Sequence, residues 1–156
     1  MNPILFATDG SPSAAAAQTE AFELAKLMEA PLVVVSVVHP VLPTVGYSAY
    51  GYSNLVAELA DAEKHRVEDL LRHVGDAAKE LGIACTTVAA SGPTVDAIVA
   101  VAEERHARML VVGSHGWGLG GRFVHGSVST ALLHAAPCPV LVVRSPEHAG
   151  EKANAA

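Results

Sequence analysis

The sequence is poor in aromatic side chains, which make up only 4% of its 156 residues. Its core must therefore be filled by aliphatic residues, and hydrophobic residues as a group reach 51%. Charged residues account for only 17%, a composition that excludes an intrinsically disordered chain. A chain of this length and composition favours one domain, with a buried parallel sheet covered by alanine-rich helices.

Basic clusters and long apolar runs are also lacking. No block of Lys or Arg stands out, and the formal net charge is -6 with His neutral. A nucleic-acid partner would require a basic stripe, so we expect no nucleic acid. No apolar run approaches the roughly 20 residues that span a bilayer, and the short run near the start is too short for a signal peptide. We therefore expect a cytoplasmic protein with no membrane partner.

Cysteine is scarce, and familiar catalytic motifs are missing. Cys85 and Cys138 form no CxxC or Cys/His metal spacing, so we expect two reduced, buried thiols. The patterns GxxxxGK[ST], HExxH and GxSxG are absent. His65, Asp69 and His73 share one helix face and could bind a metal, but a solvated polar face is the more common meaning of such a pattern.

Strand-like and helix-like patterns alternate along the chain. This alternation predicts an α/β fold, with a single doubly wound five-stranded parallel sheet and helices on both faces. One domain would span 1–146, followed by a polar tail over 147–156. A tyrosine-containing loop over 39–54 would either cover a ligand or, as we favour, pack on the surface. We predict strands over 3–7, 32–38, 83–90, 109–112 and 140–143, and helices over 13–29, 55–81, 94–106 and about 127–135.

Two turns follow predicted strands and carry polar residues suited to a ligand site. The first, after strand 3–7, reads Thr8-Asp9-Gly10-Ser11, and the second, after strand 109–112, reads Gly113-Ser114-His115-Gly116. Ligands of open α/β sheets bind beyond the carboxyl ends of the strands, where the strand order reverses. If these two strands are neighbours, the two turns face each other across one crevice.

The second turn opens a glycine-rich segment that leads into a helix start near Ser127. Glycines let backbone amides approach an anion, and the first amides of a helix lack internal partners. Ser127 and Thr130 can add hydroxyls, and Arg122 or His125 a positive charge. A flexible surface loop with an ordinary serine cap is the alternative. We favour a phosphate site, because strand, glycines and helix start occur in the required order.

The spacing Gly113-x2-Gly116-x9-Gly126-Ser127 resembles the nucleotide signature of the universal stress protein family, in its ATP-binding branch. The turn over 7–11, the motif over 110–116 and the closing strand over 136–143 resemble other conserved parts of that family, so the resemblance covers nearly the whole chain. It implies a Rossmann-like fold of the adenine nucleotide alpha hydrolase type. It also implies a homodimer that pairs through Val140–Val143.

The resemblance further implies a nucleotide-dependent regulator or sensor in stress response, read by an unknown protein partner. ATP would be the ligand, with Mg²⁺ bound to its phosphates. The Asp9 carboxylate would accept from ligand hydroxyls or amines, and the backbone of Val37 would meet adenine. The resemblance assigns no catalytic residue. The binding residues would be Ala7, Thr8, Asp9, Val37, Val112, Gly113, Ser114, His115, Gly116, Arg122, His125, Gly126, Ser127, Val128 and Ser129.

Two other functions are compatible with parts of the same segment. A dinucleotide fingerprint, Gly116-x-Gly118-x-x-Gly121, matches by letter, but it follows the wrong strand and does not run straight into a helix. A slow ATP-hydrolysing enzyme of the same fold is the more serious alternative. Such an enzyme needs a positioned base, for which Asp9, His115 and His125 are the candidates. We favour a sensor, because the sequence places none of these three convincingly.

Overall fold

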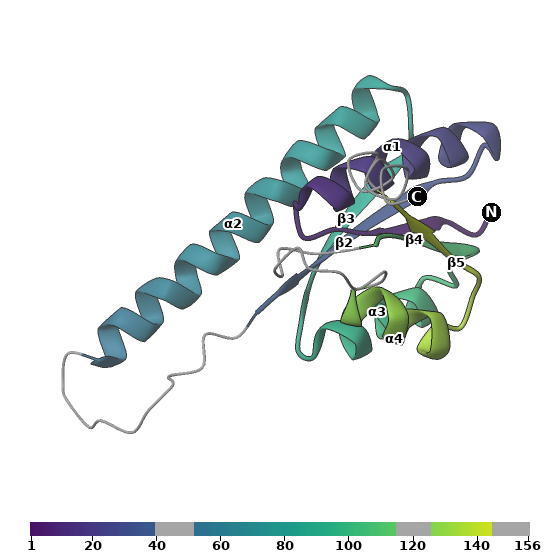
Figure 1. Ribbon diagram of the computed structural model, residues 1–156. Helices are drawn as coiled ribbons and strands as arrows, with labels where there is room; N and C mark the ends of the chain where they lie inside the picture. Colours follow the sequence, from purple (N-terminus) through teal and green to yellow (C-terminus); the bar gives the residue numbers. More distant parts are fainter. Residues whose placement is uncertain (40–51, 115–125, 145–156) are drawn as a thin grey trace, which may run out of the picture.

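Five parallel strands form the central sheet, in the order β3-β2-β1-β4-β5 (Figure 1). The structure, a computed structural model, describes residues 1–39, 52–114 and 126–144. This sheet confirms the α/β fold predicted from the alternation of strand and helix patterns. The elements are β1 (Ile4–Ala7), α1 (Pro12–Leu27), β2 (Leu32–Val38), α2 (Tyr52–Glu80), β3 (Cys85–Ser91), α3 (Thr94–Glu104), β4 (Met109–Gly113), α4 (Ser127–Ala135) and β5 (Val140–Val143).

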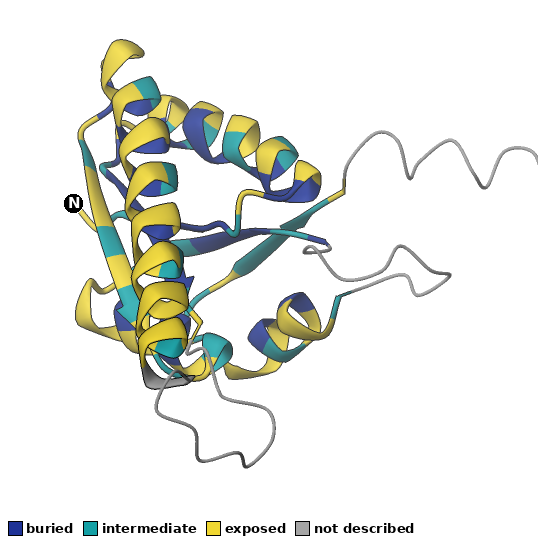
Figure 2. Cartoon of the chain, turned by 90° about the vertical axis from the view of Figure 1, so that its left-hand side faces the viewer, coloured by how far each residue is buried: buried dark blue, intermediate teal, exposed yellow. Residues whose placement is uncertain are grey.

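Helices cover both faces of the sheet, because each central strand is apolar on both sides. Successive residues of a strand point to opposite faces. Ile4 and Phe6 of β1 therefore pack in the core under α1 and α2, whereas Leu5 and Ala7 pack in the core under α3 and α4. Figure 2 shows the buried sides of the helices turned toward the sheet and their exposed sides turned away. The two layers confirm the doubly wound arrangement.

The buried side of α1 is formed mainly by small side chains, whereas Ala15 and Thr19 are exposed and Leu27 is 81% exposed. Small side chains let the helix lie close to the sheet, and those that α1 buries are Ser13, Ala14, Ala17, Ala21, Phe22 and Ala25.

Helix α2 begins at Tyr52, earlier than the predicted start at Leu55, so the predicted loop over 39–54 is too long at its carboxyl end. Ser53 and Asn54 favour caps and turns in general, which is why the sequence suggested a later start. The amino-terminal part of α2 projects beyond the edge of the sheet (Figure 1). Residues 40–51 lie outside the described residues.

Three helices end with a residue of positive φ, and only one of these is glycine. Gly82 follows α2 with a φ of 74°. Glu29 and His106 occupy the equivalent places after α1 and α3, with φ of 51° and 50°. In both cases the next N–H closes back onto the helix, from Ala30 to the Ala25 carbonyl and from Ala107 to the Ala102 carbonyl, each over 2.9 Å. These are the six-to-one bonds of a Schellman helix end.

The two cysteines are free thiols but are only half-buried, not fully buried as expected. Cys85 lies on the edge strand β3, of whose seven residues four are exposed, and Cys138 precedes β5. Partial burial raises the pKa of both thiols. Within the described residues, no helix is both long enough and apolar enough to cross a membrane.

Candidate functional site

Strands β1 and β4 are neighbours, which satisfies the condition for one shared crevice. Ala7 pairs with Val112 at the carboxyl end of both strands, so the turns that follow leave the sheet side by side. The chain leaves β1 toward α1 on one face and leaves β4 toward α4 on the other. The strand order therefore reverses between β1 and β4, and this is where open α/β sheets bind ligands.

The turn after β1 is held by its own side chains. The N–H of Thr8 donates to the carbonyl of Val35 on β2 over 3.0 Å, so the sheet continues one residue beyond β1. The N–H of Ser11 donates to Oδ1 of Asp9 over 2.9 Å, and the N–H of Gly10 donates to Oγ1 of Thr8 over 3.2 Å. Gly10 has a φ of 77°, which suits glycine. This Asx turn engages Oδ1 of Asp9 just beyond the carboxyl end of β1.

The two helices that follow β1 and β4 along the chain, α1 and α4, have different amino-terminal caps. Helix α1 is capped by Ser11, whose Oγ accepts from the N–H of Ala14 over 3.2 Å. Helix α4 starts after Gly126, which has extended backbone and no side chain to cap the helix. Ser127 and Val128, in its first turn, are exposed. The start of α4 therefore lacks a side-chain cap, which leaves room for an anion to bind its first N–H groups.

Gly113, the last residue of β4, has a packing role that the sequence did not reveal. A Cβ at this position would lie 2.8 Å from the carbonyl carbon of Ser13 and 2.9 Å from the backbone nitrogen of Ala14. The first turn of α1 therefore packs directly on the backbone of β4. The absence of a side chain at Gly113 serves this packing, whether or not a ligand also approaches.

Ser114 joins three elements at the end of β4. It is 1% exposed. Its N–H donates to the Val143 carbonyl of β5 over 2.8 Å, and its carbonyl accepts from the N–H of Gly126 over 2.7 Å. Its hydroxyl lies 3.3 Å from the hydroxyl of Ser13 on α1. These bonds attach the start of α4 to the end of β4, so Ser114 positions the site from within the core.

Ser129 completes this attachment. Its hydroxyl lies in the first turn of α4 and is buried. It donates to the carbonyls of Gly126 and Ser114, over 3.0 Å and 3.3 Å. Of the two serines in this turn, Ser129 therefore faces the core, whereas Ser127 is exposed.

The other predicted site residues differ in how far they are exposed to solvent. The side chains of Ala7, Val37 and Val112 are buried in the core under α3 and α4, so only their backbones are placed to meet a ligand. Thr8 is also buried, whereas Asp9 and Gly126 are partly exposed. The remaining predicted residues, His115, Gly116, Arg122 and His125, lie outside the described residues.

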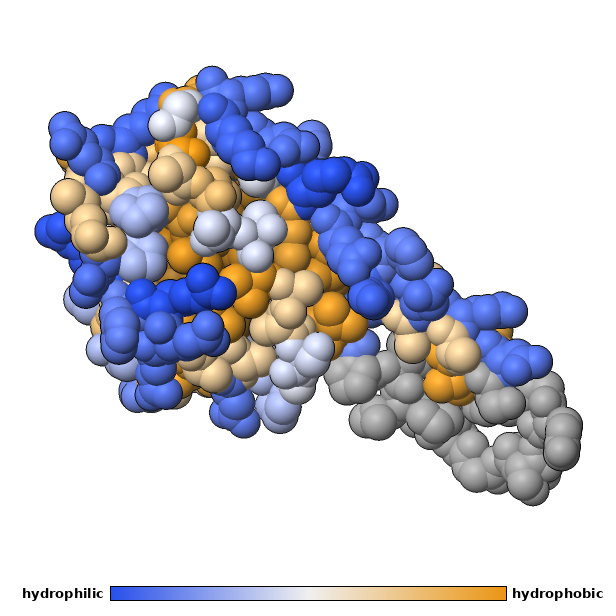
Figure 3. Space-filling model, turned by 180° about the vertical axis from the view of Figure 1, so that it is seen from behind, coloured by the Kyte–Doolittle hydropathy of each residue, from blue (hydrophilic) through white to orange (hydrophobic). Residues whose placement is uncertain are grey.

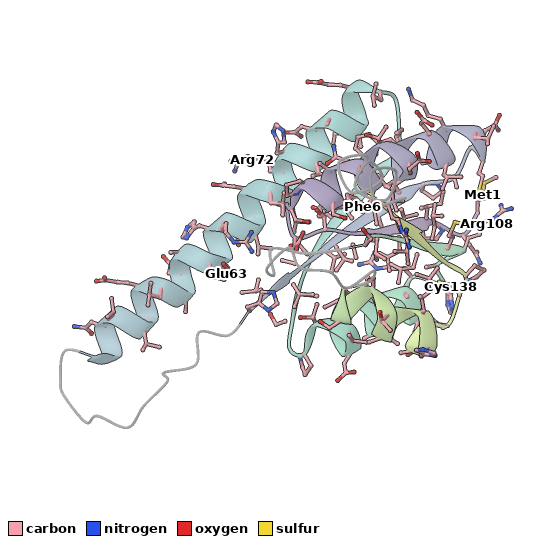
Figure 4. The ribbon with its side chains drawn as sticks, viewed as in Figure 1. Met1, Phe6, Glu63, Arg72, Arg108 and Cys138 are labelled. Carbon is pink, nitrogen blue, oxygen red and sulfur yellow. The ribbon has the colours of Figure 1, made fainter. Side chains whose placement is uncertain are left out.

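Glu63 of α2 (Figure 4) forms an ion pair with Arg66 that the sequence pattern did not single out. Nε of Arg66 lies 2.8 Å from Oε2 of Glu63, and Nη2 lies 3.0 Å from Oε1. The hydrogen bond from Arg66 lowers the pKa of Glu63, and a backbone hydrogen bond from His39 contributes in the same direction. The bond to Glu63 raises the pKa of Arg66, with a smaller contribution from the charge of Asp9. The i, i+3 spacing of opposite charges was the only available signal.

Two of the three candidate metal ligands on α2, His65 and Asp69, form hydrogen bonds with other groups of the same helix. Nδ1 of His65 lies 2.8 Å from the carbonyl of Asp61, and Asp69 accepts from Nη2 of Arg72 over 2.8 Å. In the part of the chain that the structure describes, no group of three His, Cys, Asp or Glu residues is arranged to hold a metal ion. Figure 3 shows hydrophilic side chains along the outer side of α2, among which are several ion pairs.

The fold defines a doubly wound α/β protein whose strand order reverses between β1 and β4, the place where proteins of this class bind ligands. The family model of the universal stress protein family matches residues 1–144. A universal stress protein of Methanocaldococcus jannaschii is 34% identical over 144 residues, which are 92% of this chain and 82% of that protein. The chain belongs to the universal stress protein family.

Solved structures agree with this assignment. The universal stress protein UspA from Lactobacillus plantarum aligns with a TM-score of 0.79 and 27% identity, over 92% of this chain and 97% of that one. A universal stress protein whose crystal structure is in complex with cAMP aligns with a TM-score of 0.65 and 26% identity, over 92% of this chain and 97% of that one. The resemblance inferred from the glycine spacing is thereby confirmed at the level of family and fold.

Proposed function

We propose that this protein binds ATP with Mg²⁺ at the carboxyl ends of β1 and β4, where the two turns lie side by side. We further propose that it acts as a cytoplasmic, nucleotide-dependent regulator. One observation carries the proposal. Ala7 pairs with Val112, and the N–H of Gly126 donates to the Ser114 carbonyl over 2.7 Å. These two contacts bring the Asp9 carboxylate and the uncapped start of α4 to the same end of the sheet. A nucleotide needs both, since it has a polar nucleoside end and an anionic phosphate end.

The proposed roles follow from what each residue exposes. Asp9 would accept hydrogen bonds from the nucleoside, and the backbone at Val37 would meet adenine. The backbone of Gly126, Ser127 and Val128 would bind the phosphates at the positive end of the α4 dipole. Mg²⁺ would bind through phosphate oxygens and water, which are the ligands it prefers. The relative in complex with cAMP supports an adenine nucleotide as the ligand class.

The proposal includes a homodimer formed through β5. This strand lies at the edge of the sheet next to β4, and its four residues are all half-buried. An edge strand with unpaired backbone groups can add a second strand across a two-fold axis. Val140–Val143 would form that contact, and an unidentified protein partner would read the nucleotide state.

The decisive experiment is to denature the purified protein and identify any released nucleotide, followed by calorimetry with ATP and Mg²⁺. We expect binding by the wild type and a loss of at least tenfold in Gly126→Val, whose side chain would obstruct the phosphates. Gly75→Ala, in α2, is the control and should bind as the wild type does. Absence of heat and of a thermal shift at millimolar ATP would contradict the proposal.

Turnover separates this proposal from the hydrolytic alternative. Of the three candidate bases, the structure describes Asp9, whose Oδ1 accepts the N–H of Ser11. That bond gives Asp9 a turn-forming role, so we propose binding without efficient hydrolysis. A multiple-turnover ATPase rate that disappears in Asp9→Ala or His125→Ala would favour the enzyme instead.

A further inference from the structure

The face of α2 that carries Arg66 packs against the turn that carries Asp9. Gly10, at the centre of that turn, lies so close to α2 that a Cβ on it would be 3.4 Å from both terminal methyl carbons of Leu70. Arg66 precedes Leu70 by four residues, so the two side chains lie on the same helix face, one turn apart. Arg66 therefore lies on the face of α2 that packs on the β1–α1 turn. The charge of Asp9 is accordingly one of those that act on Arg66.

Glu63 holds that guanidinium in a fixed orientation. The two side chains form a two-pronged contact, with distances of 2.8 Å and 3.0 Å. Such a fork fixes the plane of the guanidinium as well as its position. The pair therefore presents an ordered guanidinium on this face of α2.

A second pair on the same helix provides an internal comparison. Arg72 and Asp69 have the same i, i+3 spacing, but a single contact of 2.8 Å joins them. Their side chains are 68% and 64% exposed, against 45% and 19% for Arg66 and Glu63. Exposed single-contact pairs contribute little, because solvent screens them and their side chains remain mobile. The Arg66–Glu63 pair is the more ordered of the two.

We propose that Arg66, held by Glu63, is a positioning residue for Asp9 and thereby for the nucleoside end of the ligand. This inference rests on the proposed function. A fixed positive charge beside the carboxylate orients it before the ligand arrives, so less ordering is needed on binding. Arg66 acts through Asp9 and does not itself contact the phosphates.

The test compares ATP, AMP and adenosine as probes in calorimetry. Arg66→Ala should weaken all three by a similar factor, about fivefold to tenfold. Arg66→Lys keeps the charge without the fork and should recover part of the affinity. Arg72→Ala, the matched control, should bind as the wild type does. A loss that grows with the number of phosphates would overturn the proposal, because it would make Arg66 a phosphate contact.

A second measurement tests whether Arg66 acts through Asp9. In an Asp9→Asn background, Arg66→Ala should cause no further loss of affinity. An undiminished loss there, or wild-type affinity in Arg66→Ala alone, would overturn the proposal.

If the wild type binds no nucleotide, the proposed function fails, and urea unfolding still tests the contact. The shifts in unfolding midpoint for Arg66→Ala and Asp9→Asn should then be non-additive, whereas those for Arg72→Ala and Asp9→Asn should add. Additive shifts for Arg66 and Asp9 would overturn the inference.

Discussion

Gly113 and Ser13 lie so close that a Cβ on the glycine would be 2.8 Å from the carbonyl carbon of the serine and 2.9 Å from its oxygen. Both obstructing atoms belong to the backbone of α1, so no side chain can turn away to make room. We expect Gly113→Ala to lower the free energy of unfolding by about 2–3 kcal/mol, the typical cost of overpacking. Urea unfolding followed by circular dichroism measures this change.

Gly75→Ala provides the control for that substitution. A Cβ at Gly75 would lie 3.1 Å from Cγ2 of Thr87, which belongs to a side chain on the edge strand β3. The threonine can shift, and alanine favours helix over glycine by about 1 kcal/mol. Stability close to that of the wild type is expected. If Gly75→Ala were as destabilising as Gly113→Ala, the special role of the α1–β4 contact would be contradicted.

The helix ends at Glu29 and His106 offer a route to higher stability. Both residues have a positive φ, which costs an L-residue roughly 1–2 kcal/mol relative to glycine. Glu29→Gly and His106→Gly should each raise the free energy of unfolding by about 1 kcal/mol, as measured by urea unfolding. Gly82→Ala should lower it by a similar amount. A loss of stability in both glycine variants would show that the side chains contribute more than the strain costs.

Ser127 and Ser129 should separate ligand binding from stability. Ser129→Ala removes the hydroxyl that donates to the carbonyls of Gly126 and Ser114, so we expect a loss of about 1–2 kcal/mol in unfolding free energy. Ser127 is exposed, so Ser127→Ala should unfold as the wild type does but bind ATP more weakly. Paired urea unfolding and calorimetry test both variants. The reverse pattern would contradict the assignment of Ser127 to the ligand and Ser129 to the fold.

Glu63 should make stability depend on pH. The hydrogen bond from Arg66 lowers its pKa in the folded state, so its carboxylate stabilises the fold above the unfolded-state pKa, near 4.3. This contribution is lost as the pH falls through the lower, folded-state pKa. We expect Glu63→Gln to be less stable than the wild type at pH 7, with the difference shrinking below about pH 4. Urea unfolding at a series of pH values measures the difference.

The exposed Arg72–Asp69 pair is the control for this pH series. Asp69→Asn should change the unfolding free energy by no more than a few tenths of a kcal/mol, because exposed pairs are weak. A Glu63→Gln difference that stays constant with pH would mean that the ionised carboxylate contributes nothing.

The sheet could be predicted from sequence because its signals are local. Runs such as Leu32–Val38 are buried on both faces, so nearly every residue is apolar and the strand is unmistakable. The neighbouring position of β1 and β4 could be stated only as a condition, because pairing between distant strands leaves no local mark. The buried side of α1 could not be predicted, because alanines carry most of its packing and have a weak hydrophobic signal.

Some residues of the candidate site, too, can be proposed from local sequence signals, whereas others depend on how distant segments pack together. Asp9 and Gly126–Val128 could be proposed from the sequence because they follow a strand or open a helix. Arg66 could not, because its position depends on how α2 packs on the β1–α1 turn, where Leu70 meets Gly10. For Gly113, the sequence suggested close approach of a ligand, whereas the structure shows close approach of a helix. Spacing alone does not distinguish the two.

The hydrogen bond between Gly126 and Ser114 means that residues 115–125 begin and end at one point of the fold. Since both ends are anchored by described residues, closing the chain between them costs an entropy that grows only slowly with its length. The junction of β4 and α4 can therefore accept intervening segments of different length without changes to the sheet.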